Sequence, residues 1–188
     1  MPSECSPHQG WSIGAVGHRY LPVERLDLLR AISRALSDLA GDCAGEPGGV
    51  ELLVSVAEGA DRLFIEAAAS LGIPYTCVLP CSPSCFERDF ASPHSIMEFR
   101  RLLGGARRIV QPEDEPAERV TGYLWVNHYI LDRADALIAV WDGLPANGPA
   151  GTGESIEDAA ERRIPVIWIP TEAPHEPVVL TLATSTFE

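Results

Sequence analysis

Short apolar runs alternate along this chain with longer segments in which apolar residues recur every three or four positions. The apolar runs have the length of buried strands and lie at 11–17, 50–56, 74–80, 107–112, 135–141 and 164–169. The segments with a helical period lie at 22–40, 59–71, 84–90, 93–103, 117–133 and 153–163. Strands that alternate with helices are typical of parallel sheets, because each parallel connection must cross back over the sheet. The pattern therefore predicts an α/β fold with a mostly parallel sheet.

The length of the chain fits one domain, which we predict to span 1–188 with its core at about 11–169. The helix predicted at 22–40 presents one apolar face, formed by Leu26, Leu29, Ile32, Leu36 and Leu39. The tail from Thr171 follows the last predicted strand, and we expect it to be a surface extension.

The basic residues of the chain are all arginines. There are 14 of them, and the net charge is −13. Without lysine the chain cannot form a Schiff base, attach pyridoxal phosphate or build the lysine of a P-loop. The negative charge argues against nucleic acid as a partner, because a polyanion is repelled at long range. A few arginines and backbone N–H groups can still bind a small anion.

The length of the apolar segments bears on where the protein is located, and the spacing of the cysteines bears on metal binding. No apolar stretch approaches the length of a membrane span and no signal pattern is present, so we expect a cytoplasmic protein without membrane contact. Cys77, Cys81 and Cys85 follow a C-x3-C-x3-C spacing, but Pro80 and Pro83 interrupt it. Because the spacing matches no common zinc or iron–sulfur pattern, we predict no metal site and no cofactor, with Cys77 in a buried strand and two thiols in a loop.

Polar, glycine-rich segments follow several of the predicted strands. "GHRY" follows the first strand, "AEGADR" the second, and "DGLPANGPAGTGES" the strand at 135–141. In open parallel sheets the carboxyl ends of the strands share one edge, and ligands bind there. We therefore predict a ligand site at this edge.

The first two of these segments carry candidate binding groups. Arg19 could clamp a phosphate and His18 could donate to a ligand hydroxyl, directly after Gly17. Alternatively, Arg19 forms a salt bridge with a loop acid. In "AEGADR", Gly59 permits a tight turn, while Asp61 would either bind a ribose or stabilise the helix dipole.

The third segment opens a helix on glycines, whose free N–H groups favour an anion. Gly151 and Gly153 let the backbone approach a ligand, and Thr152 could cap the helix or donate its hydroxyl to a phosphate. Asp142, followed by Gly143, could accept from ribose hydroxyls at the strand end. The alternative is a strand-to-helix loop with a threonine cap and no ligand.

Two side chains suggest further chemistry. Glu154 lies at the mouth of the loop, where a carboxylate beside a phosphate could serve as the catalytic base or nucleophile of N-glycosidic bond cleavage. Glu157 and Glu161 follow on the same face, and we expect them to be solvated. Tyr123 could stack on a base or belong to the core.

Taken together, these motifs resemble the SLOG superfamily, Rossmann-like domains related to the lonely-guy phosphoribohydrolases and to DNA-processing protein A. "GHR", "AEGAD", "LP…FERDF" and "DALIAVWDG…GPAGTGES" occur in order at strand ends over roughly 11–169. The resemblance implies a three-layer Rossmann-like fold with helices on both faces, a nucleotide pocket and self-association into a homo-oligomer. It places ligand-facing motifs at Gly17, Arg19, Gly59, Asp61, Asp142, Gly151 and Thr152.

Members of this superfamily differ in what they do. Some cleave nucleoside monophosphates, whereas others bind nucleotide signals without hydrolysis, often in bacterial conflict systems. The cleaving enzymes carry a glutamate where this chain has Ser155, and Glu154 lies one position early, about 100° around the helix. We therefore expect a nucleotide sensor or binding protein. The alternative is an N-glycosidic hydrolase or transferase acting on nucleoside monophosphates or deoxynucleosides.

Overall fold

The strands of the computed structural model form one sheet. The structure describes residues 10–21, 25–42, 49–146 and 148–180. In these ranges the sheet has seven strands in the order β4-β3-β2-β1-β5-β6-β7. The strands are β1 (Trp11–Gly17), β2 (Val50–Val54), β3 (Tyr75–Val78), β4 (Arg108–Val110), β5 (Ala136–Trp141), β6 (Val166–Pro170) and β7 (Val178–Leu180). All pairs are parallel except β6 with β7, which confirms the predicted α/β fold with a mostly parallel sheet.

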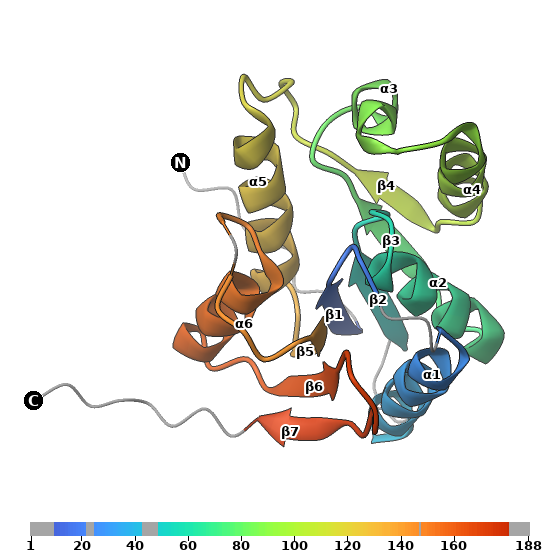
Figure 1. Cartoon of the computed structure of the whole chain (residues 1–188), viewed down its shortest axis with the longest axis vertical. Coiled ribbons are helices and arrows are strands. Elements are labelled where there is room, and N and C mark those ends of the chain that lie inside the picture. The colour runs from blue at the N-terminus through green and yellow to red at the C-terminus, as the bar shows by residue number, and fades with distance from the viewer. Residues whose placement is uncertain (1–9, 22–24, 43–48, 147, 181–188) are drawn as a thin grey trace, which may run out of the picture.

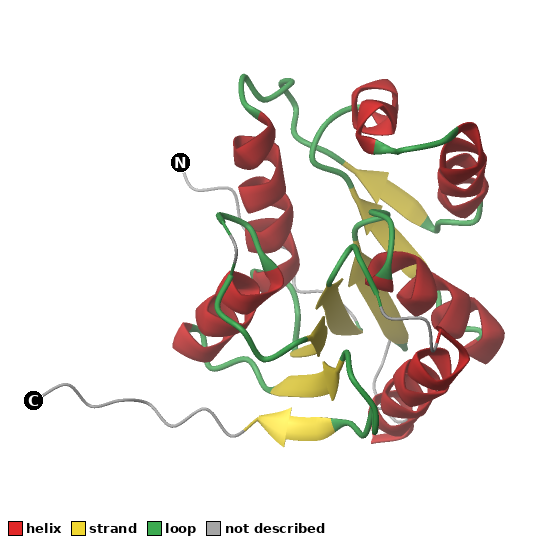
Figure 2. Cartoon of the chain, viewed as in Figure 1, coloured by secondary structure: helices red, strands yellow, loops and turns green. Residues whose placement is uncertain are grey.

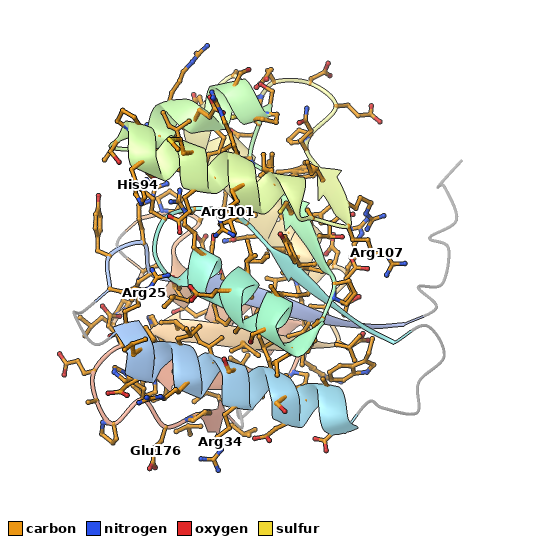
Figure 3. All side chains as sticks on the ribbon, turned by 90° about the vertical axis from the view of Figure 1, so that its right-hand side faces the viewer. Arg25, Arg34, His94, Arg101, Arg107 and Glu176 are labelled. Carbon is orange, nitrogen blue, oxygen red and sulfur yellow. The ribbon has the colours of Figure 1, made fainter. Side chains whose placement is uncertain are left out.

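Helices cover both faces of this sheet, as Figure 1 and Figure 2 show. The helices of the described residues are α1 (Arg25–Asp42), α2 (Ala60–Leu71), α3 (Pro83–Phe86), α4 (Pro93–Gly104), α5 (Arg119–Leu131) and α6 (Thr152–Glu161), with a 3₁₀ turn η1 (Glu87–Asp89). Helices α1, α2 and α4 lie in front of the strands in Figure 3, and α5 and α6 lie on the opposite face. The three predicted layers are therefore present.

Each face of the sheet has its own apolar core. Leu28 of α1, Phe64 of α2 and Phe99 of α4 are fully buried on one side. Ile130 of α5 and Ile156 of α6 pack on the other side. Burial of such side chains, about 1.5–3 kcal/mol each, fixes the sheet between the two helix layers.

The strand order reverses between β1 and β5. From β1 the chain proceeds outward through β2, β3 and β4, and then returns to place β5 on the other flank of β1. Connections that leave in opposite directions open a crevice at the carboxyl ends of these two strands. The fold therefore places a site where "GHRY" and "DGLPANGPAGTGES" begin.

Two predictions about the elements are wrong in detail. The chain after Thr171 is not a surface extension throughout, because β7 adds an antiparallel strand to the sheet along β6. In α1, Leu26 is 68% exposed, while Leu28 is fully buried instead. The predicted start of this helix at Pro22 lies outside the described residues, and α1 is described from Arg25.

Among the helices of the described residues, none has both the length and the apolar character that crossing a membrane requires.

Candidate functional site

A cavity of about 970 Å³ opens at the carboxyl edge of the sheet, beside the ends of β1 and β5. The structure brings into its wall most of the residues predicted for the site. These are Gly17, His18, Arg19, Asp61, Tyr123, Asp142, Gly151, Thr152 and Gly153. Gly59, Gly143 and Glu154 are not among the lining residues. Segments far apart in sequence therefore meet at the edge that the strand order selects.

Two glycines let the segment after β1 lie against the start of α2. A Cβ atom on Gly17 would lie 2.5 Å from the Ala60 Cβ. Gly59 has φ +89°, and a Cβ there would lie 2.2 Å from the Arg19 carbonyl oxygen. The Ala60 N–H donates to the His18 carbonyl over 3.0 Å. Gly59 thus lets the start of α2 pack directly against the backbone of His18 and Arg19.

His18 and Asp142 join the ends of the two central strands. The Asp142 backbone N–H donates to His18 Nε2 (3.2 Å), and Asp142 Oδ1 lies 3.0 Å from the same nitrogen. Partial burial raises the pKa of Asp142, but the Leu144 N–H and His18 together lower it by more. The pKa of this carboxyl therefore lies below its ordinary value. An ionised carboxylate therefore stands at the rim of the cavity, where it can accept from a ligand hydroxyl.

Arg19 belongs to a chain of polar side chains along one wall. Its guanidinium donates to the Tyr123 hydroxyl (3.3 Å), which donates to Asp89 Oδ2 (2.5 Å), and Asp89 pairs with Arg119. Arg19 forms no ion pair within the described part of the chain, so the alternative interpretation, a salt bridge to a loop acid, does not hold there. The Tyr123 ring meets Phe86 edge-on, with centroids 6.1 Å apart. Tyr123 therefore orients Arg19 toward the cavity.

Asp61 is the most perturbed acid of the cavity wall. It lies at the start of α2, only 6% exposed, and accepts from the Ala57 N–H over 3.1 Å. Burial raises the pKa of its carboxyl to about 7, although the Ala57 N–H, Arg19 and Arg62 lower it. Asp61 can therefore exchange a proton near neutral pH.

The start of α6, whose first backbone N–H groups have no side-chain cap, forms another part of the cavity wall. Gly151 is the residue before the helix and no side chain caps it, so Thr152 is the first helical residue and not the cap. The N–H groups of the first turn of a helix have no intrahelical acceptor and carry the positive end of the dipole. Thr152 and Gly153 are both buried in this wall. The uncapped N–H groups at the start of α6 are therefore suited to bind an anion.

The sequence suggests that Glu154 faces the ligand, but in the structure Ser155 lines the cavity and Glu154 does not. The Glu154 carboxylate accepts from the Ala150 N–H, where the backbone has φ +61°. It therefore holds the loop that precedes α6. Ser155, only 1% exposed, lines the cavity, and its hydroxyl donates to the Gly151 carbonyl over 3.2 Å.

Two lining residues escape sequence reasoning. Ser55 directly follows β2, and Asn127 lies in the middle of α5; they are 9% and 8% exposed. Within the described part of the chain, Ser55 Oγ and Asn127 Nδ2 are buried without a hydrogen-bond partner. A signal existed in the sequence, because each is a polar residue inside an apolar run, in "LLVSVA" and "LWVNHYI". Which way such a residue faces depends on packing between elements that are distant in sequence.

Comparison with solved structures agrees with this architecture. DNA processing protein A from Streptococcus pneumoniae matches with a TM-score of 0.61 and 14% identity over 88% of this chain. The same protein from Helicobacter pylori gives 0.57 and 15%, and TM1055, a structural genomics target, gives 0.53 and 14%, each again over 88%. The chain therefore shares the Rossmann-like α/β fold of these structures. It spans 55% of the S. pneumoniae chain, 68% of the H. pylori chain and 76% of TM1055.

These similarities are visible in structure and not in sequence. No protein-family model and no curated protein matches the sequence of this chain. At 14–15% identity the matches establish the fold alone.

One prediction about partners is wrong. The net charge of −13 argued against nucleic acid. However, the matched H. pylori structure describes a single-stranded DNA binding mode of DNA processing protein A. The charge argument fails because screening confines the long-range field to about 8 Å at physiological salt, so that groups at the site decide. Here Arg19, Arg119 and the start of α6 line the cavity together with Asp61, Asp89 and Asp142.

Proposed function

We propose that the cavity binds a nucleotide or a nucleotide-derived ligand, and that the chain acts as a nucleotide sensor or binding protein. The observation that carries the proposal is the pair of buried polar groups in the cavity wall, Ser55 Oγ and Asn127 Nδ2, without partners in the described residues. Leaving such a group unsatisfied costs about 1–3 kcal/mol. A ligand with polar atoms would remove this cost.

The other walls of the cavity match the remaining parts of a nucleotide. A phosphate would lie at the uncapped start of α6, within reach of Arg19. Asp142 and His18, which are held together across the strand ends, would accept from and donate to ribose hydroxyls. The volume of about 970 Å³ lies at the upper end of ordinary ligand pockets, about 300–1,000 Å³.

Binding of a ligand panel to the full chain tests this proposal. The panel holds nucleoside mono-, di- and triphosphates, NAD, ADP-ribose and a short single-stranded oligonucleotide, measured by calorimetry. We expect one small ligand to bind, and Arg19→Gln and Asn127→Leu each to weaken it by about tenfold or more. Arg34→Gln is the control, because Arg34 is an exposed residue of α1 (Figure 3) and does not line the cavity.

Two outcomes would contradict the proposal. One is a folded protein that binds no member of the panel, or whose Arg19→Gln and Asn127→Leu variants bind as the wild type does. The other is binding of the oligonucleotide alone, which would replace the small-ligand proposal by single-strand binding.

A second candidate function is hydrolysis of an N-glycosidic bond, and Asp61 is the observation that favours it. Its carboxyl lines the cavity and has a pKa of about 7. In this reaction a water oxygen attacks C1′ as the C1′–N bond breaks, and the base leaves with the electron pair. Asp61 would take the proton of the water and return it to the departing base.

Release of free base distinguishes the roles of the two acids. Each panel ligand is incubated with the wild type, Asp61→Asn and Glu154→Gln, and products are separated by chromatography. Hydrolysis that is lost in Asp61→Asn and kept in Glu154→Gln assigns the proton transfer to Asp61. The converse result would restore the catalytic role predicted for Glu154. A ligand that stays intact with the wild type leaves binding as the function.

A further inference from the structure

Two thiols and a carboxylate lie close together outside the cavity, at the turn that follows β3. Cys81 lies in this turn, Cys85 lies in α3, and Glu115 belongs to the loop between β4 and α5. One ligand atom from each residue, two sulfurs and a carboxylate oxygen, all lie within 4.8 Å of one another. None of the three residues lines the cavity. The cluster is therefore a separate feature of the fold.

Local structure holds the three groups in place. The Ser82 N–H donates to Glu115 Oε1 over 3.2 Å, which ties the acidic loop to the turn. The Cys85 N–H donates to the Ser82 carbonyl over 3.0 Å at the start of α3. Gly122 of α5 packs so closely on this turn that a Cβ there would lie 2.4 Å from the Pro80 carbonyl oxygen. The cluster is thus fixed by contacts that do not themselves need a metal.

The donor set has a recognisable preference. Thiolate sulfur selects soft and borderline cations such as Zn²⁺, and a carboxylate oxygen is an accepted third ligand. We propose that Cys81, Cys85 and Glu115 form a binding site for a divalent cation of the zinc class. The site supplies three protein ligands and leaves a fourth position for water or another donor. It was not predicted from the C-x3-C-x3-C spacing, because Glu115 is 30 positions away from Cys85 and Cys77 is buried in β3.

Metal binding here has a defined proton balance. The cation displaces one proton from each thiol into solvent, and both sulfurs donate an electron pair to it. Affinity consequently rises with pH.

Cobalt titration of the reduced full chain tests the site. Co²⁺ bound by thiolates gives a charge-transfer absorption band that oxygen ligands do not give. We expect one equivalent of Co²⁺ to produce this band and Zn²⁺ to remove it by competition. Cys81→Ser and Cys85→Ser should abolish the band.

Matched variants separate this site from other parts of the chain. Glu115→Gln should weaken binding, because it removes the charged ligand oxygen. Glu113 is an exposed acid in the same loop, and Glu113→Gln should bind as the wild type does. Cys5 and Cys43 lie outside the described residues, so a Cys5→Ser, Cys43→Ser double variant is the control for the thiols.

Three results would overturn the assignment. They are the absence of a charge-transfer band in the reduced wild type, a band that survives in Cys85→Ser, and a band that disappears in the Cys5→Ser, Cys43→Ser variant. Cys85 is only partly buried, so its serine variant stays informative even if Cys81→Ser does not fold. Circular dichroism verifies the fold of each variant.

Discussion

At the scale of single residues, the cavity wall contains side chains that cost the folded chain stability. Asp61 is an ionisable group at 6% exposure, and Asn127 and Ser55 keep buried polar atoms without partners among the described residues. A core selected for stability alone would replace such groups by apolar ones of similar shape. Because these three groups all lie in the wall of one cavity, that cavity is the candidate site for binding or chemistry.

The loss of folding stability caused by the buried Asp61 carboxyl depends on pH in a way that can be measured. The ordinary pKa of this carboxyl is 3.8, and in the folded chain burial raises it to about 7. Between these values the unfolded chain loses the proton while the folded chain keeps it, so the free energy of unfolding falls as pH rises and is lowest above pH 7. Asparagine cannot ionise. Asp61→Asn should therefore exceed the wild type in stability at pH 8, by on the order of a few kcal/mol.

Denaturant unfolding of both proteins at a series of pH values measures this difference. It should shrink as pH falls and vanish near the ordinary pKa of aspartate. A stability difference that does not change with pH would show that the Asp61 carboxyl titrates normally in the folded chain.

At the scale of elements, local periodicity predicts the helices and all but one of the strands. The missed strand, β7, contains only three residues, and its pairing with β6 depends on a chain reversal that no local pattern reports. In α1 the apolar residues are numerous enough to suggest two faces, and only packing against α2 and β6 selects Leu28 over Leu26. Sequence patterns thus predict elements well, but not which of several apolar stripes is buried.

The site shows the same division between local and long-range information. Residues of strand-end loops, such as Arg19, Asp142 and Gly151, could be predicted because each loop directly follows or precedes an element. The orientation of Glu154 could not, because it depends on the left-handed backbone of Ala150. Asn127 reaches the cavity only because α5 crosses the sheet beside β1.

Two glycines that end or begin elements provide a matched pair of substitutions. Gly59 and Gly72, at the two ends of α2, both have positive φ. A Cβ on Gly72 would meet nothing within 4 Å, whereas one on Gly59 would collide with the Arg19 and His18 carbonyls. Gly72→Ala should destabilise by about 1–2 kcal/mol through backbone strain alone. Gly59→Ala should cost about 1–3 kcal/mol more through overpacking.

Chemical denaturation and ligand binding together check this pair. Gly59→Ala should also weaken ligand binding, because it displaces the backbone that carries His18 and Arg19, while Gly72→Ala should not. Equal losses of stability in the two variants would contradict the close approach of Gly59 to that backbone.

At the scale of the whole molecule, the site lies where the sheet reverses its order, and its wall brings cationic groups together within an acidic chain. The chain carries a net charge of −13, yet the cavity wall includes Arg19, Arg119 and the start of α6 beside its three aspartates, Asp61, Asp89 and Asp142. A small anion is therefore repelled at a distance and held on contact. Salt acts differently on these two effects, because it screens charges in solvent more strongly than buried contacts.

The salt dependence of binding follows from this arrangement and distinguishes the two kinds of ligand. For a mononucleotide, raising the salt concentration from about 10 mM to about 150 mM shortens the screening length from about 30 Å to about 8 Å. Long-range repulsion then weakens, so the association rate should rise severalfold while the dissociation rate changes little. A single strand that binds through several phosphates releases counterions instead, and its affinity falls with each increase in salt. Stopped-flow measurement with a fluorescent mononucleotide reads the first behaviour. An association rate that falls with salt would mean that the arginines of the cavity, and not the net charge, govern the approach of the ligand.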